Sequence, residues 1–476
     1  MKHLKYIGLI LTISLFLACD EDFLEPVPQN VVSTENYFLN DSQIESGVIG
    51  VYDAIQGVNS TNLSDNRGVQ QEFYVTEMRS DNTRTKNQEG EAAEFETYTV
   101  TPNNGIVENY YRSAYSTIYR ANLVLGSLEN ASVSAAPIFE GEAKFARAYS
   151  YFNLVRLFGD VPLVDKVIAP TDSQTAFTRV STSLIYDLIV SDLETAALNL
   201  SNTGDYSRAS KASAEALLAK VHLTLGNYLD AQILCENVMS YGYTLEPNFN
   251  DVFYNEGNNE IIFSIVYNSG IETDSQDFSA EFMNGVGRTV GVNYVTTDAV
   301  TFLDANGGPN RTPFSYRIDP FQPSQNQVVK YLPNGEDGGA DGKTFVSDAT
   351  LSGNDWIVLR YSDVLLMHVE SIIGAGVSTG SQAALDSYET VRTRSGLLGD
   401  ADNNITKQEL LDERRAELAF ENQRLFDLLR FGEAQSVLST HSTAIGGSFS
   451  ATDLLLPIPQ REINLSNGIM AQNPGY

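Results

Sequence analysis

The side chains that could perform acid–base or nucleophilic chemistry show no catalytic spacing. Hydrolysis of a glycosidic bond needs two carboxyl groups at a defined separation, and the 61 aspartates and glutamates could supply such a pair in many places. A nucleophilic triad needs a positioned histidine. Of the four histidines, His3 lies in an N-terminal leader, and His222 and His368 fall within helical patterns that favour packing. We therefore predict that the protein is not an enzyme.

Sequence motifs for cofactors and metals are also missing. The chain has no Walker loop, no dinucleotide fingerprint and no His-Glu-x-x-His motif. Residues 400–404 begin like a calcium-binding loop, but Ile405 stands where that loop needs glycine and Leu411 where it needs the closing glutamate. We predict a polar turn that caps a helix starting near Thr406, and neither a cofactor nor a metal site.

The first residues form a separate unit that does not belong to the fold. Two lysines precede thirteen largely apolar residues, Tyr6–Ala18, which are too few to span a bilayer. Cys19 follows directly, and this arrangement resembles a bacterial lipobox, in which the cysteine is acylated and becomes the new N-terminus. We predict a lipoprotein signal peptide over residues 1–18 and lipidation of Cys19.

The residues next to this cysteine, Asp20-Glu21-Asp22, resemble the acidic signal with which Bacteroidetes send lipoproteins to the outer face of the outer membrane. A solvated acidic linker is the alternative. The second cysteine, Cys235, lies in an apolar helical stretch and is expected to behave as a small core residue. The sequence therefore predicts a surface-exposed, lipid-anchored protein without a disulfide framework.

Composition and charge indicate an ordered, acidic protein. Of the 476 residues, 42% are hydrophobic and 10% aromatic, which is enough to bury a large core. The formal net charge of −31 argues against nucleic acid and against an anionic membrane surface, because binding to either needs a basic patch. We expect no nucleic-acid partner.

Helical periodicity dominates the chain. In 210–225 the apolar residues from Ala214 to Leu225 fall on one stripe, and a second helix follows directly over 228–239. The two helices together resemble a tetratricopeptide unit. Similar pairs recur at 104–128 with 139–158 and at 362–373 with 382–395. Such units cannot bury their faces alone, so we predict a mostly α-helical fold in which helix pairs stack into a scaffold.

The pattern changes over about 248–354. Residues 260–267 predict a strand, and long connections rich in glycine, asparagine and aspartate follow it. Loops of this length are usually functional or disordered. The aromatic residues of the region are Phe278, Phe282, Tyr294, Tyr316 and Phe321. We predict an ordered, irregular, loop-rich subdomain that contains short strands and faces a ligand.

The C-terminal part carries segments of distinctive sequence. Residues 413–432 read ERRAELAFENQRLFDLLRFG, and the chain closes with LLPIPQREI at 455–463 and QNPGY at 472–476. Together with RAYSYFNLV at 147–155 and LRYSDVLLM at 359–367, these segments resemble the SusD/RagB family of outer-membrane nutrient-binding lipoproteins.

The resemblance implies one SusD-like domain over residues 19–476, built from tetratricopeptide-like helix pairs and a less regular face. It also implies a cell-surface protein that binds glycan and delivers it to a SusC-like TonB-dependent outer-membrane transporter. A peptide ligand, as in the RagB branch, stays open as the alternative. The charged residues of 413–424 are expected to join packed helices, since charges held at helix junctions usually serve packing.

In the SusD family the ligand face draws on two regions, which correspond here to about 77–104 and 267–316. Aromatic rings stack on sugars, while Asp, Asn and Arg bond to the hydroxyl groups. The candidate ligand-binding residues are Arg79, Asp81, Asn82, Arg84, Tyr98, Asn103, Phe282, Arg288 and Tyr294. The single tryptophan, Trp356, lies in a matched, structural stretch, so tyrosine or phenylalanine must do the stacking. A uronate polymer whose carboxylates pair with the three arginines is also a possible ligand.

Overall fold

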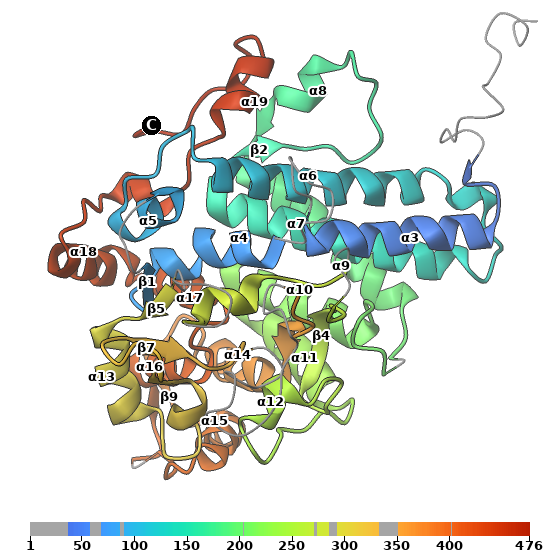
Figure 1. Cartoon of the computed structure of the whole chain (residues 1–476). Helices are drawn as coiled ribbons and strands as arrows, with labels where there is room; N and C mark the ends of the chain where they lie inside the picture. The colour runs from blue at the N-terminus through green and yellow to red at the C-terminus, as the bar shows by residue number, and fades with distance from the viewer. Residues whose placement is uncertain are drawn as a thin grey trace, which may run out of the picture.

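The computed structural model describes residues 37–57, 68–85, 90–202, 204–270, 274–284, 293–332, 351–400 and 402–476. The predicted signal peptide, the lipidated Cys19 and the candidate Arg288 lie outside the described residues. Within them, helices predominate and the strands are short, so the predicted mostly α-helical class is confirmed (Figure 1). No helix of this part of the chain combines the length and the apolar content that crossing a membrane requires. The boundaries of the domain and of its subdomain stay predictions.

Four long helices form one side of the scaffold: α3 (Asp41–Gln56), α6 (Gly105–Leu125), α7 (Ala136–Phe158) and α9 (Thr182–Asn199). Helix α6 packs against both α3 and α7, and α9 packs on α7 (Figure 1). Helices α6 and α7 are the first of the predicted helix pairs. Their contact surface is rich in aromatic side chains, and the rings of Tyr111 and Phe158 meet edge to face at 5.1 Å.

The pair α10 (Lys211–Leu225) and α11 (Tyr228–Met239) is also confirmed. Ser210 caps α10 at its start, and Gly226 ends it in the left-handed conformation (φ +77°), which glycine adopts without strain. The predicted stripe is buried except for Leu225, which is 40% exposed. This residue is the last of the helix, directly before the turn at Gly226.

The third predicted pair consists of α14 (Tyr361–Ile373) and α15 (Gln382–Arg394), and α14 also packs on α11. His368 of α14 is buried, and its Nδ1 lies 2.9 Å from Oγ of Ser387 on α15. Burial lowers the pKa of this histidine, with Glu236 acting in the opposite direction. His368 is therefore a packed interface histidine, as predicted.

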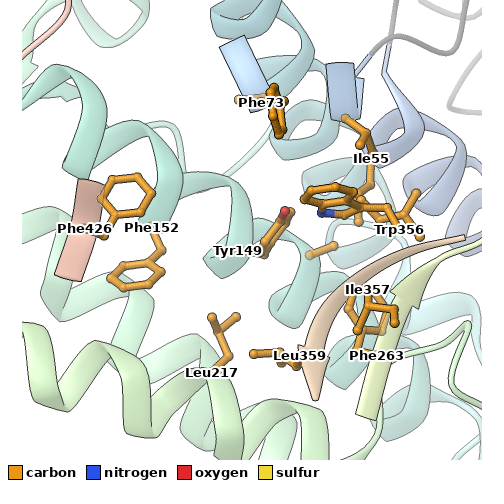
Figure 2. Packing of buried hydrophobic residues seen from close by; sticks show 14 of the residues in the cluster. Ile55, Phe73, Tyr149, Phe152, Leu217, Phe263, Trp356, Ile357, Leu359 and Phe426 are labelled. Atoms are coloured by element: carbon orange, nitrogen blue, oxygen red, sulfur yellow. The ribbon is translucent and has the colours of Figure 1, made fainter. Parts of the chain in front are cut away.

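The main hydrophobic core lies between these helices and a two-stranded ribbon. Strand β4 (Ile261–Ile265), which the sequence predicts, pairs antiparallel with β8 (Trp356–Arg360). Figure 2 shows Phe263 and Trp356 of this ribbon among the buried residues, together with Phe152 of α7. Trp356 is 3% exposed and contacts other buried rings. It is a structural residue, as predicted, and its ring is covered.

The charged C-terminal segment joins helices, as predicted. Glu417, the last residue of α16 (Lys407–Glu417), is fully buried and accepts hydrogen bonds from Arg311 (2.7 Å), Arg360 (2.6 Å) and Arg394. Burial alone would raise the pKa of Glu417, but the three guanidinium groups outweigh burial and lower it well below its usual range. These ion pairs tie α16 to segments that are distant in the sequence.

The turn before α16 is the predicted polar cap. The N–H of Asn404 donates to Asp400 (2.7 Å) and to Asp402 (3.1 Å). The side chain of Thr406 accepts from the N–H of Glu409, whose carboxylate accepts from Thr406 in return. This reciprocal arrangement is a capping box, which satisfies N–H groups that a helix start leaves free.

The middle region contributes β5 (Asn293–Val295), α13 (Thr297–Asn306) and the hairpin of β6 (Tyr316–Ile318) and β7 (Asn326–Val328). Strand β5 pairs antiparallel with β1 (Thr83–Thr85), which comes from the N-terminal part of the chain. Strand β7 packs against β5, and Figure 1 shows these elements grouped on one side of the molecule. This group of short elements carries the candidate site.

Candidate ligand-binding site

Two of the predicted residues meet on the ribbon that β1 and β5 form. Arg84 on β1 and Tyr294 on β5 are register partners, although they are far apart in the sequence. Paired residues of an antiparallel ribbon lie on the same face, with Cβ atoms about 4.5–5.5 Å apart. The neighbouring Thr83, Thr85 and Val295 point to the opposite face and are buried, whereas Arg84 and Tyr294 are half-buried. The ribbon therefore presents the pair outward.

A buried carboxylate holds Arg84 in place. Nη2 of Arg84 lies 3.4 Å from Oε1 of Glu96 on α5 (Gly90–Thr97), and Glu96 also accepts a hydrogen bond from Thr85 Oγ1 at 3.1 Å. Burial raises the pKa of Glu96, with the bonds from Thr85 and the charge of Arg84 acting against it. Nε of Arg84 is buried and has no hydrogen-bond partner among the described residues, while the side chain as a whole is 18% exposed. Glu96 thus orients the guanidinium, and only its exposed part can donate to a ligand.

Tyr294 stays a neutral phenol at ordinary pH. Burial raises the pKa of Tyr294, and the positive charge of Arg84 only partly offsets this effect. A neutral tyrosine ring has an apolar face and a hydroxyl group that both donates and accepts. The arginine and the tyrosine together can therefore bind a ligand that has both C–H surfaces and hydroxyl groups.

Asp81 and Asn82 lie directly before the ribbon, but both side chains are buried. Asp81 accepts from Arg424 at 2.8 and 2.9 Å and lies 3.0 Å from Arg415. Asn82 donates to Glu77 (2.8 Å) and accepts from Arg415 (3.1 Å). Burial would raise the pKa of Asp81, but Arg424 and Arg415 lower it well below its usual range. These two side chains anchor the start of β1 to the C-terminal helices.

Arg79, Tyr98 and Phe282 are internal as well. The Arg79 guanidinium donates to two backbone carbonyls at 3.1 and 2.6 Å, and the Tyr98 hydroxyl donates to the Arg79 carbonyl at 3.0 Å. The Tyr98 ring packs edge to face on Phe449, 4.9 Å away. Phe282 is 1% exposed and packs on Phe73. All three side chains therefore stabilise the layer beneath the ribbon.

The structure places most of the predicted ligand contacts inside the protein. The five buried members are Arg79, Asp81, Asn82, Tyr98 and Phe282. They were predicted because polar and aromatic residues cluster there in the sequence, but their polar atoms bond to buried groups of the protein. Asn103 is exposed in the turn before α6, and no hydrogen bond joins it to the described part of the ribbon. Arg84 and Tyr294 are the pair that the fold brings together.

Sequence reasoning did not include the exposed aromatic residues of the neighbouring hairpin in the site. Phe321 is 50% exposed and Phe314 is 38% exposed. The hairpin loop is held by Asp319, which accepts from the N–H of Phe321 at 2.8 Å and from Asn284. The aromatic content of the region was the available signal, and it did not indicate which rings the core would cover.

His441 on α18 (Ala434–Ile445) was also missed, because nothing in its local sequence links it to the ribbon. It is 8% exposed, interacts electrostatically with Asp81 and Arg84, and its Nε2 has no hydrogen-bond partner among the described residues. Burial lowers the pKa of His441, with Asp81 acting in the opposite direction. The imidazole is a buried polar group within electrostatic reach of Arg84.

Two protein-family models match parts of this chain. A model described as "SusD family" matches residues 341–476, and a model described as "Starch-binding associating with outer membrane" matches residues 22–223. Strands β5, β6 and β7 lie between the two matched ranges.

Similar proteins and solved structures match this chain over all or most of its length. SusD-like protein P2 of Formosa agariphila is 27% identical, with 100% of both chains covered. The solved structure of a laminarin-binding SusD-like protein is 25% identical, has a TM-score of 0.75 and covers 92% of this chain and 100% of its own. Surface glycan-binding protein A of Bacteroides thetaiotaomicron, solved with laminarihexaose, shares the fold at 22% identity, with a TM-score of 0.74 and coverage of 91% and 99%.

Proposed function

This chain belongs to the SusD family, and from this premise we propose that it binds glycan on the outward face of the β1–β5 ribbon and performs no chemistry on it. The observation that carries the proposal is the pairing of Arg84 with Tyr294. One residue supplies oriented hydrogen-bond donors and the other an aromatic ring, and both side chains are partly exposed on the same face.

The chemistry of the pair suits a sugar ring. A pyranose has an apolar C–H face that packs on an aromatic ring, and hydroxyl groups at its edge that bond to planar polar groups. Glu96 holds the guanidinium of Arg84, so little side-chain entropy is lost when a ligand binds. The exposed ring of Phe321 on the adjacent hairpin supplies apolar surface for a further sugar unit.

The names of the similar proteins guide the choice of the first ligands. Laminarin and laminarihexaose are bound by two proteins of this fold, and starch binding is part of one family description. We therefore propose a neutral glucan as the first candidate. A uronate polymer or a peptide mixture would be retained instead if the arginine served to bind a carboxylate.

We also propose that the mature chain is anchored through acyl groups on Cys19 at the surface of the outer membrane and passes glycan to a SusC-like TonB-dependent transporter. The lipobox-like sequence supports the anchor, since each buried methylene contributes about 0.8 kcal/mol to membrane binding. The description of the matching family model supports the outer membrane as the location. The transporter is proposed from the family resemblance.

The test uses the soluble chain from Asp20 onward. Affinity electrophoresis against laminarin, starch, a uronate polysaccharide and a peptide mixture identifies the ligand class, and calorimetry measures its Kd. We expect Tyr294→Ala to weaken glycan binding about tenfold, which is about 1.4 kcal/mol. The matched control is Tyr119→Ala on α6, which removes a 51% exposed tyrosine and should leave the Kd unchanged.

Three results would contradict the proposal. Equal affinity of wild type and Tyr294→Ala would place the ligand elsewhere, and retention of peptides alone would identify a peptide-binding protein. Release of shorter sugars by the pure protein, abolished by substituting one carboxylate, would identify an enzyme.

A further inference from the structure

A second cleft, separate from the ribbon, lies on the helical scaffold. Its volume is about 250 Å³, and it is enclosed by the segment before α10, the segment after α11 and the turn between α12 (Asp251–Tyr254) and β4. Three tyrosines line it: Tyr206, Tyr241 and Tyr243. Figure 1 places α11, α12 and β4 well to the right of β1 and β5, so the cleft is not a continuation of the first site.

The scaffold constrains the three tyrosines. The Tyr241 hydroxyl donates to Glu215 of α10 at 2.7 Å, while Tyr206 interacts electrostatically with Asp355 and Tyr243 with Ser210. Rings fixed in this way lose little conformational entropy when a ligand packs on them.

A glycine allows one of the rings to lie against the backbone. Gly257 has φ +67°, and a Cβ atom at this position would lie 2.8 Å from Cε1 of Tyr206. Any other residue would push the Tyr206 ring away and strain the turn. The turn thereby holds this ring at the wall of the cleft.

The cleft also presents side-chain amides. Asn259 is exposed, and its side chain has no hydrogen-bond partner among the described residues, while its backbone is held by Glu246 (3.2 Å) and Thr244 (3.2 Å). Asn202 accepts from the N–H of Ala212 at 2.8 Å, and its NH₂ group donates to no described residue. Amide groups offer both a donor and an acceptor in one plane, as adjacent sugar hydroxyls require.

The charge of the lining selects among ligands. No lysine or arginine lines the cleft in the part of the chain that the structure describes, and Asp205 contributes a carboxylate. An anionic ligand such as a uronate would find no lysine or arginine in the described lining to pair with. The volume lies just below the range of about 300–1,000 Å³ typical of drug-sized ligands, which suits one sugar ring.

We infer that this cleft is a second glycan-binding site, which takes one neutral pyranose unit between the three tyrosine rings and the amide of Asn259. The inference rests on the proposed function, since it takes the ligand class from there. A chain with two sites binds a long polysaccharide more tightly than a short oligosaccharide wherever both sites reach the same molecule.

Equilibrium dialysis of the soluble chain with laminarihexaose, at concentrations up to saturation, counts the sites directly. We expect two bound molecules per wild-type chain, with the affinity of one site lowered about tenfold in Tyr294→Ala, that of the other lowered in Asn259→Ala, and both lowered in the double variant. Asn259→Ala removes an exposed side chain that bonds to no described residue, so it should leave the fold intact. Tyr241→Ala removes a wall of the cleft and should act in the same way.

Gln174→Ala is the control, because it removes an exposed amide on α8 (Ser173–Phe177), far from both sites. A single site in wild type, weakened by Tyr294→Ala and unchanged by Asn259→Ala, would overturn the second site while the proposed function stands. A count of one that depends only on Asn259 would overturn the ribbon site instead. If wild type binds none of laminarihexaose, maltohexaose and an oligouronate, both proposals fail. If the cleft binds the oligouronate as tightly as laminarihexaose, the inferred preference of the cleft for neutral sugars is overturned.

Discussion

Asp81 shows how a single carboxylate can hold together parts of the chain that are far apart. It lies between the buried guanidinium groups of Arg415 and Arg424, and asparagine in its place could not neutralise either. Loss of one partner from a buried ion pair costs about 3–5 kcal/mol, because the remaining charge stays buried. We expect Asp81→Asn to lower the free energy of unfolding by this amount, measured by urea denaturation.

The matched control for Asp81→Asn uses the other partner of the same arginine. Asp298 lies 2.7 Å from Arg415, but its side chain is 62% exposed. Exposed ion pairs contribute about 0–1 kcal/mol. Asp298→Asn should therefore change the free energy of unfolding little. An equally small effect of Asp81→Asn would contradict the prediction that the buried ion pairs of Asp81 stabilise the fold.

Glu77 gives the stability a dependence on pH. Burial raises the pKa of Glu77 to about 7, although Asn82 and the N–H of Phe420 bond to its carboxyl group. The folded protein therefore binds a proton that the unfolded chain, with a pKa near 4.5, has already lost. The stability that this proton contributes is complete below about pH 4.5 and is lost as the pH rises through 7.

We expect Glu77→Gln to remove this loss, because glutamine is neutral and can still accept the same two hydrogen bonds. Relative to wild type, the free energy of unfolding of the variant should rise between pH 5 and pH 8, by up to about 3 kcal/mol. Urea titrations of both proteins at several pH values measure the difference. A difference that does not change with pH would mean that Glu77 titrates normally in the folded protein.

At the scale of the element, α16 depends on the cap that precedes it. Thr406 accepts from the N–H of Glu409 at 3.2 Å, and removal of such a cap costs about 0.5–2 kcal/mol. We expect Thr406→Ala to lower the free energy of unfolding by about 1 kcal/mol. Ser381 precedes α15 in the same way but makes no side-chain cap, so Ser381→Ala should have almost no effect. Equal effects in urea denaturation would contradict the assignment of the cap.

The elements differ in how well local sequence predicts them. Helices α10 and α11 repeat an apolar stripe over several turns, and α10 ends at Gly226, so their existence follows from residues within each segment. Strands β1 and β5 have three residues each, too few for a period of two to be visible. They exist because they pair with each other, and pairing between distant segments leaves no local signal.

At the scale of the whole molecule, we expect the proposed lipid anchor and the fold to be independent. We expect Cys19→Ala to move the protein from the outer-membrane fraction to a soluble fraction, since the acyl chains, and not the protein surface, provide the attachment. The far-UV circular dichroism and the thermal unfolding should match those of the soluble chain from Asp20. A Cys19→Ala protein that stays in the outer membrane after fractionation would contradict the lipoprotein assignment.

The sequence by itself determined the helical scaffold, the packed role of the charged segment at 413–424 and the buried position of Trp356. It also brought Arg84 and Tyr294 into the candidate site. Periodicity and charge spacing suffice for the scaffold and the charged segment, because these depend on neighbours within a few turns, whereas the role of Trp356 and the two candidate residues followed from the family resemblance.

Only the tertiary structure decided which candidate side chains reach solvent. Asp81 and Asn82 are as polar as Arg84 and stand beside it in the sequence, yet Arg415 and Arg424 arrive from the far end of the chain and bury them. A polar side chain is covered when a distant partner satisfies it, and the local sequence does not contain that partner.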